Sequence, residues 1–142
     1  MGLLVLVSAC TLLAGMDWYR SFNAHSDSDL LVTALQHARA ESMHNTCLGS
    51  RCVDGAPHGV AVRPSDHPNA YIIFQGPSYA ARDASADVIL EASPASAATG
   101  LAEVVFAPGS GDVSAPGDIV LAEAGRTTTI TVGSEGQISW TH

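Results

Sequence analysis

Residues 3–16 form an uncharged apolar run, LLVLVSACTLLAGM, that ends at Asp17. A helix of this run would be roughly 21 Å long, at about 1.5 Å of rise per residue, whereas the hydrocarbon core of a bilayer is about 30 Å thick. The run therefore fits three kinds of segment: the core of a signal peptide, a lipoprotein signal ending at Cys10, or a membrane helix whose beginning is missing. Only Met1 and Gly2 precede it, without the basic residues of a signal peptide. We favour the membrane helix, because a helical pattern continues beyond the run.

Helical periodicity follows the apolar run. Apolar residues at i, i+3, i+4 and i+7 spacing predict an amphipathic helix with one buried stripe, and Gly49 is a typical stop signal. We expect one long helix, in which residues 1–17 form a membrane or filament-core half and residues 18–48 form an amphipathic half. Residues 27–48 of this helix should pack on the rest of the chain. The packing residues are Leu31, Ala34, Leu35 and Ala38.

Residues 49–142 have the sequence pattern of β-strands. Short segments rich in β-branched and aromatic residues are separated by Gly, Pro, Asn and Asp turns, and no helical pattern intervenes. The apolar face of such a sheet needs a cover, which the helix stripe supplies. The predicted fold class is therefore α+β, with a long N-terminal helix packed on an antiparallel, meander- or sandwich-like β head. The expected strands are 60–62, 71–74, 88–90, 101–107, 119–121, 127–132 and 137–140.

The polar residues show no pattern typical of a catalytic, cofactor or metal site. The histidines are scattered, Gly-x-Ser-x-Gly does not occur, and the chain has no lysine for a phosphate-binding loop. Acidic residues number 14 and basic residues 6, so the net charge of −8 disfavours nucleic acid as a partner. We therefore expect neither an enzyme nor a bound cofactor.

Three cysteines, Cys10, Cys47 and Cys52, leave at least one with a separate role. Cys47 and Cys52 lie close together in a stretch with Gly49 and would close a small disulfide loop in an oxidising compartment. Two free thiols are the alternative, and the role of Cys10 stays open.

Several segments, taken in order, resemble the type IV pilin-like proteins, specifically the GspH/FimT family of minor pseudopilins. The apolar run is similar to the pilin transmembrane helix, and LQHARAESM at residues 35–43 is similar to the family's amphipathic helix. Residues 58–62 and 71–76 resemble strands of the family's head, and residues 129–138 resemble its closing hairpin. The resemblance covers nearly the whole chain.

The resemblance implies a structural subunit of a type II secretion pseudopilus or of a type IV pilus. It implies a single-pass anchor in the bacterial inner membrane, an extracytoplasmic head, and other pilin subunits as partners of the N-terminal helix. Small residues in that helix would let neighbouring helices approach closely. The implied packing positions are Leu3, Leu4, Leu6, Ala9, Leu12, Leu13, Ala14 and Gly15.

One departure concerns N-terminal processing. The family's basic leader and its Gly-Phe-Thr-Leu-Ile-Glu type cleavage motif do not precede Leu3, so processing and methylation are not carried over to any residue.

Two other functional roles stay open. One is a FimT-like pilin that binds DNA for uptake, for which Arg126 is the one basic residue near the C-terminal end. The other is a secreted or lipid-anchored β-domain that binds a partner.

Overall fold

The computed structural model describes residues 27–51 and 54–142 of the chain. A helix covers residues 27–43, and the strands that follow form two four-stranded antiparallel sheets. Sheet A has the strand order β3-β2-β1-β5, and sheet B has the order β4-β6-β7-β8. The bounds are β1 His58–Val62, β2 Ala70–Gln75, the short 3-10 helix η1 Ala84–Ala86, β3 Val88–Glu91, β4 Ala97–Gly100, β5 Glu103–Phe106, β6 Gly117–Glu123, β7 Arg126–Val132 and β8 Ile138–Thr141.

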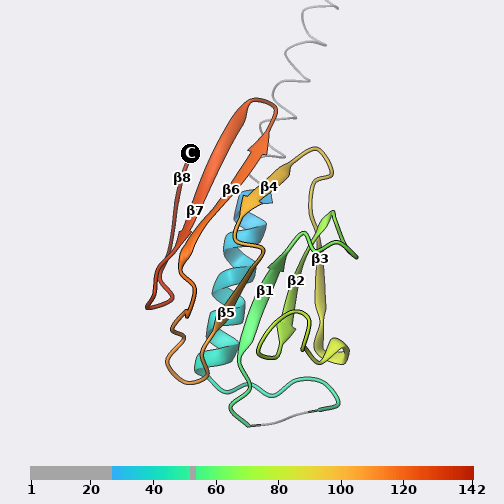
Figure 1. Ribbon diagram of the computed structural model, residues 1–142, viewed down its shortest axis with the longest axis vertical. Coiled ribbons are helices and arrows are strands. Elements are labelled where there is room, and N and C mark those ends of the chain that lie inside the picture. The colour runs from blue at the N-terminus through green and yellow to red at the C-terminus, as the bar shows by residue number, and fades with distance from the viewer. Residues whose placement is uncertain (1–26, 52–53) are drawn as a thin grey trace, which may run out of the picture.

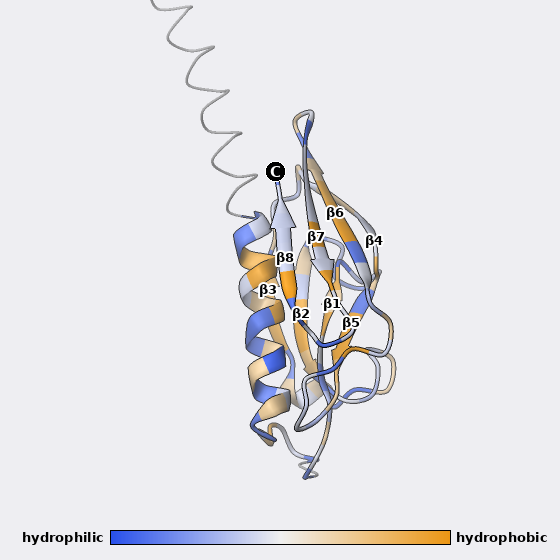
Figure 2. Ribbon diagram, turned by 90° about the vertical axis from the view of Figure 1, so that its left-hand side faces the viewer, coloured by the Kyte–Doolittle hydropathy of each residue, from blue (hydrophilic) through white to orange (hydrophobic). Residues whose placement is uncertain are grey.

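The helix packs lengthwise against both sheets, as Figures 1 and 2 show from two directions. Its apolar stripe belongs to one core with inward-facing residues of both sheets. Tyr71 and Phe106 of sheet A are fully buried in this core, as are Ile119 and Ile130 of sheet B. The opposite face of the helix, which includes Thr33, is exposed. One amphipathic helix therefore covers two sheets at once.

Sheet A is also covered on its outer face. Ala61, Ile72 and Phe74 form a second, smaller core there, and Tyr79 packs against it. The rings of Phe74 and Tyr79 meet edge to face with centroids 5.8 Å apart, and the Arg82 guanidinium lies 3.7 Å from the Tyr79 centroid. Burial on both faces explains why residues 71–74 are apolar without alternation.

The helix ends because Asn45 adopts a left-handed backbone conformation. Its φ of 49° is unusual for a residue with a side chain, and Asn tolerates it better than most. The Asn45 amide donates to the Ser42 carbonyl at 3.2 Å, and the Thr46 amide donates to the Glu41 carbonyl at 2.9 Å. These two bonds satisfy carbonyls that the last turn would otherwise leave free.

The expected strands at 60–62 and 71–74, and at 127–132 and 137–140, are confirmed, and each pair forms an antiparallel hairpin. Val60 pairs with Ile73 in the antiparallel hairpin of β1 and β2, and Ile130 pairs with Trp140 in the hairpin of β7 and β8. β4 was not predicted, because its sequence AATG lacks the apolar alternation that marks a strand.

The predicted fold class is wrong, however, in two respects. The helix that the structure describes spans residues 27–43, not the long helix expected to end near Gly49, and the expected membrane half at residues 1–17 lies outside the described residues. The strands also form two separate sheets, which excludes the meander of the two expected arrangements, meander-like or sandwich-like, because the chain crosses from sheet A to sheet B after β3, returns for β5, and crosses again. The described part of the chain is therefore mostly β.

The expected single-pass anchor in the inner membrane is likewise corrected. Within residues 27–51 and 54–142, no helix combines the length and the apolar character needed to cross a bilayer. The helix of residues 27–43 carries Asp27, Asp29, Arg39 and Glu41, so its apolar surface is a stripe and not a full circumference.

Candidate functional site

A buried carboxylate joins the helix to the point where the two sheets meet. Asp27, the first described residue, is 3% exposed. Its Oδ2 accepts from the Tyr71 hydroxyl of β2 at 2.9 Å and from Arg63 Nη2 at 3.1 Å, and its Oδ1 accepts from the Ser93 amide at 3.0 Å. The Ser96 hydroxyl also donates to Oδ2. We call these five residues the Asp27 network.

The members of the Asp27 network come from segments that are distant in sequence. Ser93 and Ser96 lie on the crossover from β3 of sheet A to β4 of sheet B. Arg63 follows β1 with a φ of 48°, and its Nη2 also donates to the Ser93 carbonyl at 2.8 Å. The Asp27 network therefore connects the helix, sheet A and the sheet-to-sheet crossover at one place.

Electrostatics keep the Tyr71 hydroxyl of the Asp27 network protonated at neutral pH. Burial, and then the neighbouring Asp27 carboxylate, raise the pKa of the Tyr71 hydroxyl well above its usual value of 10. The hydroxyl therefore keeps its proton and remains a donor to Asp27. Arg63 supplies the compensating positive charge, and its guanidinium also lies 5.6 Å from the centroid of the Tyr71 ring. The arrangement is that of a structural joint, because the Asp27 carboxylate accepts from four groups of the chain, although the buried Nε of Arg63 has no hydrogen-bond partner.

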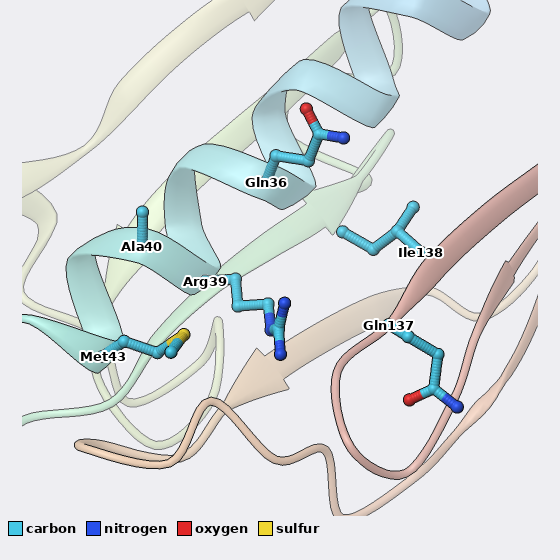
Figure 3. Close-up of a pocket in the computed structure, with 6 residues that line it drawn as sticks. All are labelled: Gln36, Arg39, Ala40, Met43, Gln137 and Ile138. Atoms are coloured by element: carbon cyan, nitrogen blue, oxygen red, sulfur yellow. The ribbon is translucent and has the colours of Figure 1, made fainter.

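A groove lies between the exposed flank of the helix and β8. Its volume is about 380 Å³. Figure 3 shows Arg39 extending from the helix toward the segment that carries Gln137 and Ile138. The lining residues are Gln36, Arg39, Ala40, Met43, Gln137 and Ile138.

Arg39 is a fixed positive charge in this groove. Its Nη2 donates to the Glu135 carbonyl at 3.1 Å, whereas its buried Nε has no hydrogen-bond partner. No carboxylate of the described residues lies within ion-pair distance of it. Gly136 makes room beside it, since a Cβ there would come within 2.8 Å of Arg39 Nε and 2.1 Å of the Gly111 carbonyl. The groove therefore offers one guanidinium among amide and apolar groups.

His58 is a buried titratable group at the start of β1. Its side chain is fully buried, and neither ring nitrogen forms a hydrogen bond. Burial lowers the pKa of His58 below its usual value of 6.5, and the charge of Glu41 opposes this only in part. Glu41 Oε1 itself lies 3.2 Å from His37 Nε2. The His58 side chain is therefore uncharged in the folded protein at neutral pH.

The structure places some of the residues singled out from the sequence and not others. The stripe residues Leu31, Ala34, Leu35 and Ala38 are each 0% exposed, in the core shared by the helix and both sheets. Cys47 is disulfide-bonded, whereas Cys10 and Cys52 lie outside the described residues, so the pairing of Cys47 with Cys52 stays a prediction. All the N-terminal packing positions, from Leu3 to Gly15, also lie outside them.

Sequence reasoning missed the Asp27 network. From the sequence alone, Asp27 looks like an acidic residue near the start of a helix, where it favours the helix dipole. Its spacing of four residues from Leu31 places it on the buried stripe, and a charged residue on that stripe signals a buried partner. The identity of the partner could not be read from the sequence, because Arg63 lies 36 residues away.

The described residues contain no group of three or more His, Cys, Asp or Glu side chains placed to hold a metal ion. Comparisons of the chain with protein families, with curated proteins and with solved structures find no match. The functional argument therefore rests on the geometry of the chain and on its sequence.

Proposed function

We propose that this chain is a structural filament subunit of the GspH/FimT type, belonging to a pseudopilus or a type IV pilus. In this proposal residues 3–16 pack against the corresponding segments of neighbouring subunits, and residues 27–142 form the head. The observation that carries the proposal is the Asp27 network. Asp27 is the described residue nearest to the apolar run, and the network bonds it to β2 and to the crossover between the two sheets.

A filament subunit needs such a joint for a mechanical reason. In this proposal, tension on the N-terminal segment reaches the head at Asp27, where both the apolar stripe and the Asp27 network hold the helix to the sheets. Hydrophobic contacts are non-directional, whereas the four donors of the Asp27 network fix the position of one carboxylate. The Asp27 network is therefore suited to a head that is pulled from one end.

Two further observations support a structural role. Cys47 is disulfide-bonded, which is typical of proteins that fold in an oxidising compartment, where these filaments are assembled. Arg39, Arg63 and Arg82 each donate to backbone or carboxylate groups of the same chain. These side chains are thus engaged within the fold, whereas DNA binding relies on clustered basic side chains that face outward.

The test is incorporation into filaments sheared from cells that produce the chain. Leu12→Asp places a charge in the apolar run and should abolish incorporation, because a charge in an apolar helix contact is strongly unfavourable. Thr33→Asp, on the exposed face of the helix, is the matched control and should be incorporated as the unmodified chain is. Circular dichroism of both variants should show the same melting transition of the head.

Two outcomes would overturn the proposal. One is incorporation of Leu12→Asp at the level of the Thr33→Asp control. The other is a mature chain whose mass shows cleavage after the apolar run or at Cys10, since a released or lipid-anchored β-domain would lack the packing segment.

A further inference from the structure

The exposed large apolar side chains of the described residues gather at two edges of the molecule. Met43 is 43% exposed beside the groove, and Trp140 is 42% exposed on β8. Val88 and Ile89, on β3, are 42% and 47% exposed. β8 and β3 lie on opposite sides of the molecule in Figure 1. The head therefore has two separate apolar edges, one on each sheet.

Both strands are at the edge of their sheet. β3 pairs with β2 alone, and β8 pairs with β7 alone. Edge strands in soluble proteins usually carry a lysine, a proline or a bulge, because their outer backbone groups are otherwise free to pair with another strand. The sequence of β3 is VILE, which has none of these features apart from the single charge of Glu91. An exposed apolar edge of this kind is typical of a contact surface.

We propose that β3 of one copy of this chain pairs antiparallel with β8 of a second copy, so that sheet B of one head continues into sheet A of the next. This contact deepens the proposed function and rests on it, since it names a second copy as a partner of the filament subunit. The register that aligns the two four-residue strands pairs Glu91 with Ile138 and Ile89 with Trp140.

The side-chain faces agree with this register. Ile138 and Trp140 lie opposite Val132 and Ile130, which are fully buried in the core, so all four face the helix side of sheet B. Ile89 and Glu91 share one face of β3, because side chains alternate along a strand. Ile89 pairs with Ile72 of the smaller outer core, so Ile89 and Glu91 face the outer side of sheet A in their own head. When Ile89 is placed beside Trp140, this outer side continues the helix side of sheet B in the second copy, and Glu91 comes to that side.

Charge complementarity selects the two partners. In the proposed register the exposed Glu91 lies beside Ile138, which lines the same groove as Arg39. Arg39 has no carboxylate partner among the described residues, so Glu91 of the second copy supplies the missing charge. Pairing of β3 with β3 would instead put Glu91 opposite Val88, an apolar residue that offers its charge no partner. The unlike pair is therefore favoured over the symmetric one.

A contact between two different edges has a further consequence. Each copy retains an unused β3 or β8 after the first contact forms, so the contact can repeat head to tail. Heterologous contacts that do not close into a ring generate helical filaments. The proposed contact is therefore compatible with a filament of many copies.

Site-specific cross-linking of the full-length chain in mild detergent tests the contact. Two variants, Ile89→Cys and Trp140→Cys, are mixed and treated with a short bis-maleimide, and peptide mass spectrometry identifies the linked residues. The mixture should give a dimer linked between positions 89 and 140, and neither variant alone should form a dimer through its new cysteine. The matched control replaces Trp140→Cys with Thr127→Cys, which is exposed on β7, a strand paired on both sides. The unmodified chain reports any linkage through native cysteines.

Charge reversal tests the role of Arg39. Glu91→Arg, added to the Ile89→Cys chain, should lower the yield of the 89–140 link roughly fivefold or more, because two cations then meet. A yield of this link no higher than with Thr127→Cys would overturn the proposed contact, as would 89–89 links as abundant as 89–140 links. The two proposals fail separately. Loss of the link with normal incorporation into filaments refutes only the contact, whereas a strong link in a chain that never enters filaments refutes only the filament role.

Discussion

Replacement of Asp27 by alanine should destabilise the head more than any exposed substitution on the same helix. The carboxylate is 3% exposed and accepts hydrogen bonds from Arg63, Tyr71, Ser93 and Ser96. Its removal leaves the Arg63 charge without its partner, in a side chain that is 10% exposed. It also leaves the Tyr71 hydroxyl and the Ser93 amide without the acceptor that Asp27 provides.

The expected loss in the free energy of unfolding is about 3–5 kcal/mol, the usual cost of removing one partner from a buried ion pair. Domains of this size have total stabilities of about 5–15 kcal/mol, so the loss takes a large share. Tyr71→Phe removes one donor and keeps the ion pair, so it should cost about 1.5–3 kcal/mol, the range for hydrogen bonds to charged groups.

Urea unfolding of each variant, followed by circular dichroism, measures these losses. Asp29→Ala is the matched control, because Asp29 is exposed on the same helix and its loss should change stability by no more than about 0.5 kcal/mol. The double variant Asp27→Ala with Arg63→Ala should cost less than the sum of the two single variants, since neither charge then remains unpaired. The reasoning is refuted if Asp27→Ala costs under about 1 kcal/mol, or if the double variant is strictly additive.

The other predictions concern His58, Gly59 and Cys47. The pKa of His58 is lowered in the folded state. The contribution of neutral His58 to stability is therefore complete above the unfolded pKa of about 6.5 and declines as the pH falls through the folded pKa. His58→Gln should flatten this part of the stability–pH profile, measured by urea unfolding. Gly59→Ala should destabilise by about 1–3 kcal/mol in thermal unfolding, because a Cβ there would come 2.5 Å from the Val104 carbonyl and 2.7 Å from the Phe74 ring. Cys47→Ser should lower the free energy of unfolding by about 2 kcal/mol if the disulfide closes the short loop to Cys52, and an equal stability of the oxidised and reduced chains would contradict this.

Local patterns predicted the elements of the head better than their arrangement. The buried stripe at Leu31, Ala34, Leu35 and Ala38 and the two hairpins follow from the spacing of apolar residues, which depends only on near neighbours in sequence. The division into two sheets could not be read in this way. It depends on which strand pairs with which, and β1 pairs with β5 across an interval that contains β4. The end of the helix was misplaced because Asn45 already adopts a left-handed conformation, four residues before Gly49 does so.

The residues of greatest interest were the least predictable ones. Asp27 and Arg63 have ordinary neighbours in sequence, and their interaction exists only once the crossover after β3 is folded beside the helix. In the sequence, Arg39 resembles an ordinary arginine on a helix surface. Only the fold shows that the turn before β8 packs against it. The apolar sequence of β3 did predict a strand, but its place at a sheet edge comes from the topology alone.

The two proposals connect through the path that a force takes across one head. In the proposed contact the force enters on β3, at the edge of sheet A, and leaves on β8, at the edge of sheet B. The helix packs on both sheets, and the crossover after β3 joins them covalently. Asp27 bonds to that crossover and to β2, so it lies where the force must pass between sheets. A buried ion pair is often no more stabilising than apolar residues of the same size, whereas its hydrogen bonds impose one geometry. In the proposed filament, any error in the angle between the two sheets would accumulate from copy to copy, so the single geometry of the Asp27 network would matter more there than its contribution to stability.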